Sequence, residues 1–175
     1  LLALLFTGCF SSGSNEEYVN PNQQYYNDMV AYFNTLPVIE NSTIMIGDSL
    51  TERGNWESFF PGKNIINFGI SGDNSEGVLK RIQQTIVRNP SKVFLMIGTN
   101  DFYAPSPGNF IPNYDEIVKT LTTSLPNTKI YVQSMLPARN NLRNNSEIES
   151  LNLKIQTIAA KYSVTYLDLY PEFID

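Results

Sequence analysis

The sequence predicts an α/β fold in which a five-stranded parallel sheet lies between two layers of helices, a three-layer α/β/α arrangement. Five short runs rich in Ile, Val and aromatic residues are bounded by Gly, Pro, Asn or Asp, as strands are. Consecutive runs begin between 22 and 37 residues apart, and the stretches between them show helical spacing of apolar residues. Strand and helix therefore alternate, and right-handed crossovers place helices on both faces of a parallel sheet.

The predicted elements follow in a regular order. The first is a helix over 23–36, which Pro37 ends. The five predicted strands cover residues 43–46, 65–68, 93–97, 130–133 and 164–167. Helical spacing recurs over 78–86, 114–125 and 148–162, and Ser146 can cap the last of these helices. With no internal repeat, these elements predict one domain over 23–175.

The composition of the 175 residues excludes several classes of function. A net charge of −5 without a basic run argues against a nucleic-acid partner, because phosphate binding draws its affinity from clustered Lys and Arg. A single cysteine permits neither an internal disulfide nor a Cys-based zinc site. Histidine is absent, which removes the commonest general base and metal ligand from any proposed chemistry.

Residues 1–22 are interpreted as the remnant of an export signal, 1–9, followed by a tether, 10–22. The apolar run ends in Leu5-Phe6-Thr7-Gly8-Cys9, which resembles the lipobox of bacterial lipoproteins, where cleavage before the cysteine leaves a lipid-modified N-terminus. The alternatives are an ordinary secretory signal and an apolar chain end without a targeting role. The expectation is an exported bacterial lipoprotein of the periplasm or cell surface, attached to the membrane through Cys9.

Small and polar residues follow the first three predicted strands. Ser49 comes two residues after Gly47, Gly72 lies in the loop after the second strand, and Asn100 follows the third. Ligands of parallel sheets bind outside the carboxyl ends of the strands, where these loops would meet. The sequence therefore predicts a site at this edge.

Each of these residues has a structural interpretation beside the chemical one. Ser49 is suited to nucleophilic attack but could simply cap a helix. Gly72 could bring its N–H close to a ligand or could serve only a positive φ, with Gly69 making the turn of the same loop. Asn100 could donate to an oxyanion or bond its own loop. Together they supply a nucleophile and neutral donors, which is what acyl transfer requires.

The sequences of 47–50 (GDSL), the Gly72 loop and 98–101 (GTND) resemble the first three conserved blocks of the SGNH or GDSL hydrolase family, most closely its platelet-activating-factor acetylhydrolase-like subgroup. The resemblance implies a flavodoxin-like fold and a serine esterase or lipase without metal or organic cofactor. It also implies that Ser49 is the nucleophile and that the N–H groups of Ser49 and Gly72, with the Asn100 side chain, form the oxyanion hole.

The Asp-x-x-His block of that family is not found in the chain. Asp168 resembles a family aspartate that precedes this block and is not assigned as the triad acid, and Asp48 and Asp101 are given supporting roles at most. Either the sequence given stops before the block or the protein is a pseudoenzyme, and the 175 residues alone should be nearly inactive.

The leading hypothesis is therefore a hydrolase acting on a small-molecule, carbohydrate or lipid ester. The alternatives are an inactive ester- or sugar-binding module on the same fold and a flavodoxin-like mononucleotide binder, in which the first turn would cradle phosphate.

Overall fold

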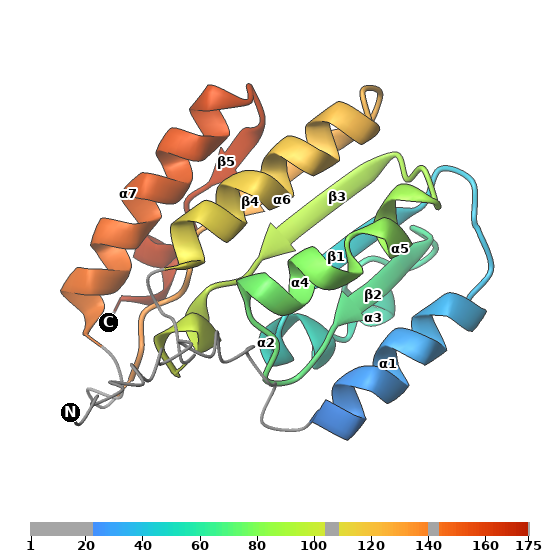
Figure 1. Ribbon diagram of the computed structural model, residues 1–175, viewed down its shortest axis with the longest axis horizontal. Coiled ribbons are helices and arrows are strands. Elements are labelled where there is room, and N and C mark those ends of the chain that lie inside the picture. Colours follow the sequence, from blue (N-terminus) through green and yellow to red (C-terminus); the bar gives the residue numbers. More distant parts are fainter. Residues whose placement is uncertain (1–22, 104–108, 140–143, 175) are drawn as a thin grey trace, which may run out of the picture.

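The computed structural model describes residues 23–103, 109–139 and 144–174. Its five strands form one sheet in the order β2-β1-β3-β4-β5, and every neighbouring pair is parallel (Figure 1). The strands are β1 (Thr43–Gly47), β2 (Ile65–Gly69), β3 (Lys92–Met96), β4 (Lys129–Gln133) and β5 (Thr165–Leu167). Each lies within one residue of its predicted bounds, so the α/β class and the five-stranded parallel sheet are confirmed. The predicted signal remnant and tether, 1–22, lie outside the described residues and stay predictions.

Helices connect the strands as the spacing predicts. They are α1 (Gln23–Thr35), α2 (Ser49–Glu52), α3 (Trp56–Phe59), α4 (Ser75–Arg81), α5 (Gln83–Ile86), α6 (Phe110–Ser124) and α7 (Asn145–Lys161), with the 3₁₀ helices η1 (Thr99–Tyr103) and η3 (Tyr170–Phe173). The helix expected over 78–86 is divided at Ile82 into α4 and α5. The predicted cap of the last helix is wrong: Asn144 caps α7 by accepting the Ser146 backbone N–H at 3.0 Å.

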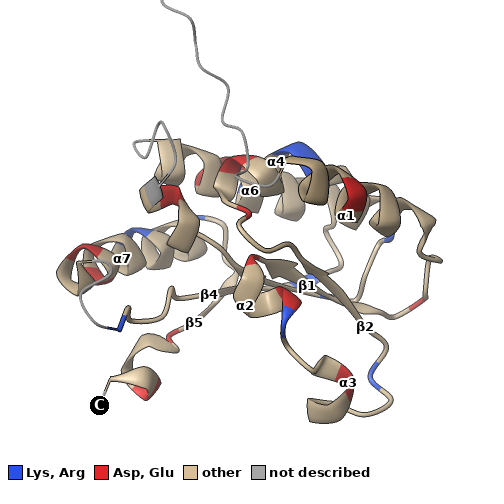
Figure 2. Ribbon diagram, turned by 90° about the horizontal axis from the view of Figure 1, so that it is seen from below, with Lys and Arg blue, Asp and Glu red and all other residues tan. Residues whose placement is uncertain are grey.

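The two faces of the sheet are covered unequally. Helices α1, α4 and α6 lie on one side of the sheet, and the short α2 and α3 lie on the other (Figure 2). The core between the sheet and the long helices is formed by alternate residues of the strands. These are Ile44, Ile46, Phe68, Val93, Leu95 and Val132. On the opposite face the half-buried rings of Phe94 and Tyr131 stack at 4.5 Å between centroids. The second helical layer is therefore present but short.

The described part of the chain contains no helix that is both long and apolar enough to cross a membrane.

Candidate active site

The strand register brings the three predicted loops to one edge. Gly47, at the end of β1, pairs with Gly69 at the end of β2 and with Met96 at the end of β3. Because parallel strands end at the same edge, the segments that carry Ser49, Gly72 and Asn100 all leave the sheet there.

Ser49 is the first residue of α2, and it is not the cap of that helix. The cap is Asp48, whose Oδ1 accepts the Leu50 backbone N–H at 2.9 Å. The interpretation of Ser49 as a cap is therefore wrong, and its hydroxyl is not needed to begin the helix. The helix lies close to the sheet, because a Cβ added at Gly69 would come within 2.1 Å of the Glu52 backbone nitrogen. Gly69 thus permits close packing of α2 rather than making the turn that the sequence suggested.

The Gly72 loop depends on a left-handed glycine. Gly72 has a φ of +80°, a conformation that favours glycine over any residue with a side chain. The loop starts beside the end of β1, where the Ile70 N–H donates to the Gly47 carbonyl at 3.1 Å, and turns back as the Asp73 N–H donates to the Ile70 carbonyl at 3.0 Å. The positive φ expected at Gly72 is confirmed, and its proximity to a ligand stays a prediction.

Asn100 connects the third loop to the second. Its Nδ2 donates to the Asp73 backbone carbonyl at 2.8 Å, so the side chain reaches the neighbouring loop. This contact orients the carboxamide beside Gly72. A carboxamide nitrogen carries two hydrogens, and this bond uses one of them.

A buried ion pair stabilises the Gly72 loop. Arg81 on α4 contacts the Asp73 carboxylate, with 2.9 Å between Nη2 and Oδ2, and both side chains are almost fully buried. Nη2 also donates to the Gly47 carbonyl at 3.3 Å. Sequence reasoning missed this pair. One signal was available, because Arg81 stands three residues after Val78, on the apolar side of the predicted helix.

Asp101 holds the start of α4 against the third loop. Its carboxylate accepts the Ser75 N–H, at 3.1 Å from Oδ2, and the Ser75 hydroxyl. Asn113 on α6 donates to the same hydroxyl at 3.2 Å. Burial raises the pKa of Asp101 to about 6. Like Asp48, Asp101 serves as an acceptor of backbone N–H groups.

A model of the GDSL-like lipase/acylhydrolase family matches residues 45–175, which include all three loops. The chain belongs to this family.

Curated relatives of this GDSL-like chain include two subunits of a mammalian acetylhydrolase. Platelet-activating factor acetylhydrolase IB subunit alpha2 of Rattus norvegicus is 28% identical over 104 residues, which are 56% of this chain and 45% of the relative. Subunit alpha1 of the same organism is 26% identical over 145 residues, 77% of this chain and 61% of the relative. The chain thus spans about half the length of the curated relatives that it matches.

Solved structures share the fold. A GDSL-like lipase from Bacteroides thetaiotaomicron superposes with a TM-score of 0.72 at 23% identity, covering 86% of this chain and 80% of that chain. A catalytic mutant of an acetylxylan esterase from Geobacillus stearothermophilus gives 0.62 at 18% identity, covering 78% and 80%. The SGNH-type fold expected from the sequence is confirmed.

The raised pKa of Asp101 predicts a pH dependence of stability for this GDSL-like domain. The folded pKa, about 6, exceeds the ordinary aspartate value of 3.8, so the native state holds the proton more tightly than the unfolded chain. The stabilisation is complete below about pH 4 and is lost as pH rises towards 6. The asparagine in the Asp101→Asn variant cannot ionise, so the variant does not lose stability through this group as pH rises. The free energy of unfolding of the variant should therefore improve relative to wild type between pH 4 and 6.5 in urea titrations; a constant difference would contradict the assignment.

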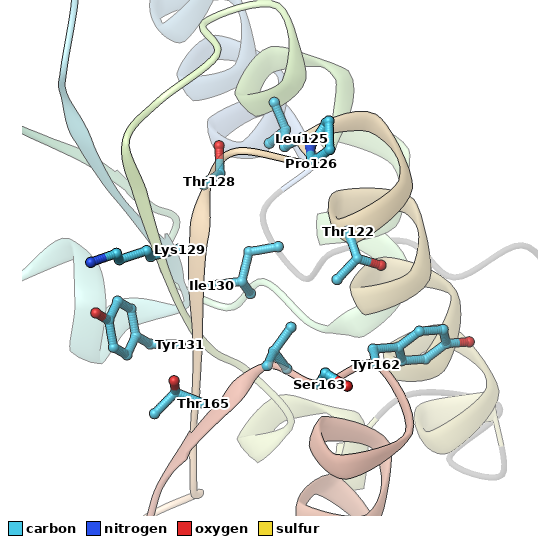
Figure 3. A pocket seen from close by; sticks show the side chains of 11 residues that line it. Thr122, Leu125, Pro126, Thr128, Lys129, Ile130, Tyr131, Tyr162, Ser163 and Thr165 are labelled. Atoms are coloured by element: carbon cyan, nitrogen blue, oxygen red, sulfur yellow. The ribbon is translucent and has the colours of Figure 1, made fainter.

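Two further features of the described part of the GDSL-like domain bear on the location of the site, namely possible metal ligands and a cavity at the opposite edge of the sheet. In residues 23–103, 109–139 and 144–174, no group of three or more His, Cys, Asp or Glu side chains could hold a metal ion. A cavity of about 670 Å³ lies at the amino-terminal ends of β4 and β5, between Lys129, Tyr162 and Thr165 (Figure 3). It is at the end of the sheet opposite to Ser49, Gly72 and Asn100 and contains none of them.

Proposed function

We propose that the chain is a carboxylic ester hydrolase that works through an acyl-enzyme at Ser49. The Ser49 Oγ bonds to the ester carbonyl carbon while its proton passes to a general base, the role that the histidine of the family's Asp-x-x-His block would fill. The tetrahedral oxygen accepts hydrogen bonds from the Ser49 and Gly72 N–H groups and the Asn100 side chain. The carbon–oxygen bond to the alcohol then breaks, the alcohol takes a proton, and water hydrolyses the acyl-serine.

The observation that carries this proposal is the contact between Asn100 and the Asp73 carbonyl. It holds a neutral donor beside the Gly72 loop, at the same edge of the sheet as Ser49. Because Asp48 caps α2, the Ser49 hydroxyl does not serve as the helix cap. Neutral donors that are fixed before the reaction suit an oxyanion, because no reorganisation is needed when its charge develops. Family membership and the esterase among the structural neighbours support the same chemistry.

A second candidate is an inactive ester- or sugar-binding protein on the same fold. It is favoured by the absence of histidine from the 175 residues, because a carboxylate with a pKa near 4 is a weak base for a serine hydroxyl. The two candidates differ in turnover: the binding protein would bind an ester without hydrolysing it. The product of the complete reading frame is the protein on which turnover should be measured.

Asn100→Ala tests the oxyanion role directly. We expect kcat for p-nitrophenyl acetate to fall by about 10²-fold with little change in KM, because the lost donor acts on charge that develops only in the transition state. Steady-state kinetics on the product of the complete reading frame measure both constants. Absence of hydrolysis by the wild-type protein would favour the binding protein, and equal rates for wild type and variant would remove Asn100 from the oxyanion hole.

A further inference from the structure

Gly72 is held by a hydrogen bond on each side, and the two bonds come from different elements. On its C-terminal side the Asp73 carbonyl accepts the Asn100 carboxamide. On its N-terminal side the Ser71 N–H donates to Oε2 of Glu52. Glu52 is the last residue of α2, one helical turn after Ser49. The helix that begins with Ser49 therefore also holds the loop that carries Gly72.

The Glu52 carboxylate is itself held in place. The Tyr25 hydroxyl on α1 donates to Oε1, and this hydrogen bond raises the pKa of Tyr25, which keeps the hydroxyl protonated as a donor. The Glu52 backbone carbonyl accepts Nδ2 of Asn67 at 2.9 Å, and Oδ1 of Asn67 accepts the Gly69 N–H at 2.9 Å. Both oxygens of the half-buried Glu52 carboxylate are thus bonded, to Tyr25 on α1 and to the Gly72 loop, while its backbone carbonyl bonds the end of β2.

We propose that Glu52 is a positioning residue, which acts through Ser71 to hold the Gly72 N–H where the oxyanion forms. The inference rests on the proposed function. Glycine has the largest conformational freedom of any residue, so a donor on Gly72 needs external constraint to be fixed before the reaction. Asn100 constrains one side of Gly72, and Glu52 supplies the constraint on the other.

Two substitutions separate the bond to Ser71 from the charge of Glu52. In Glu52→Gln the amide oxygen can still accept the Ser71 N–H, while the amide nitrogen faces the Tyr25 hydroxyl, which can act as the acceptor instead. Glu52→Ala leaves the Ser71 N–H without this partner. Glu57→Ala is the matched control, because Glu57 on the neighbouring α3 also accepts a loop N–H, that of Gly62 at 3.1 Å, in an exposed position.

Amide hydrogen exchange, followed by NMR, measures how firmly the Gly72 loop is held, and the measurement does not require the protein to be active. We expect exchange at the Ser71 amide, which donates to Glu52, to accelerate by about tenfold or more in Glu52→Ala and to stay within about twofold of wild type in Glu52→Gln and Glu57→Ala. Unchanged exchange at the Ser71 amide in Glu52→Ala overturns the inference, whether or not the protein hydrolyses esters.

Steady-state kinetics on the product of the complete reading frame then measure the effect of Glu52 on catalysis. We expect kcat for p-nitrophenyl acetate to fall by about tenfold in Glu52→Ala, with KM nearly unchanged and with recovery in Glu52→Gln. Faster exchange with an unchanged kcat overturns the positioning role. A wild-type protein without hydrolysis contradicts the proposed function instead, and the exchange result still decides whether Glu52 holds the loop.

Discussion

Ser49→Ala is expected to lower kcat for p-nitrophenyl acetate by about 10⁶-fold, since removal of the nucleophile of a serine hydrolase leaves only the contributions of the oxyanion hole and of binding. The melting temperature should stay close to that of the wild-type protein. The physical reason is the capping of α2 by Asp48, which the Ser49 side chain does not share. Hydrolysis by the product of the complete reading frame and calorimetry of the same samples measure the two quantities.

Ser58→Ala serves as the control for this variant, because Ser58 is an exposed serine on the adjacent short helix α3. Its rate and melting temperature should match the wild type. Hydrolysis by Ser49→Ala at the wild-type rate would show that Ser49 is not the nucleophile. A large fall in melting temperature would instead assign Ser49 a structural role.

The sheet and the convergence of the three loops could be predicted because both depend on short-range pattern. Each strand is an apolar run with clear bounds, and the intervals between strands permit only crossover connections. Once the strands are parallel, topology alone brings the ends of β1, β2 and β3 to one edge. This is why Ser49, Gly72 and Asn100 could be grouped from the sequence alone.

The contacts that stiffen the site could not be predicted in this way. Tyr25 and Glu52 are 27 residues apart, and nothing in the spacing of either indicates the other. The Asp101 carboxylate meets Ser75 across 26 residues, between a loop and a helix start whose packing depends on the whole domain. Polar contacts of this kind carry no periodicity, so their partners are decided by tertiary packing. The capping of α2 was missed for a related reason, since Asp48 and Ser49 are both good cap residues and only the backbone conformation selects one.

Arg81→Met is expected to lower the free energy of unfolding by about 3–5 kcal/mol, because it leaves the buried Asp73 carboxylate without its counter-charge. Methionine retains most of the aliphatic volume of arginine, so a packing defect contributes little. Urea titrations at pH 7 measure the loss. The double variant Asp73→Asn with Arg81→Met removes both charges and should recover much of the lost stability, since uncharged replacements of a buried pair are often tolerated.

The pH dependence of the Arg81→Met variant distinguishes an unpaired charge from lost packing. Burial already raises the pKa of Asp73, and Arg81 opposes this by favouring the carboxylate. Without Arg81 the folded pKa of Asp73 should rise further above the ordinary aspartate value of 3.8, so that the variant regains stability as pH falls and the carboxyl takes up its proton. The deficit relative to wild type should therefore be largest near pH 7 and should shrink towards pH 4. A deficit of the same size at both pH values would mean that Arg81 stabilises the Gly72 loop through packing and its bond to the Gly47 carbonyl, and not through the charge of Asp73.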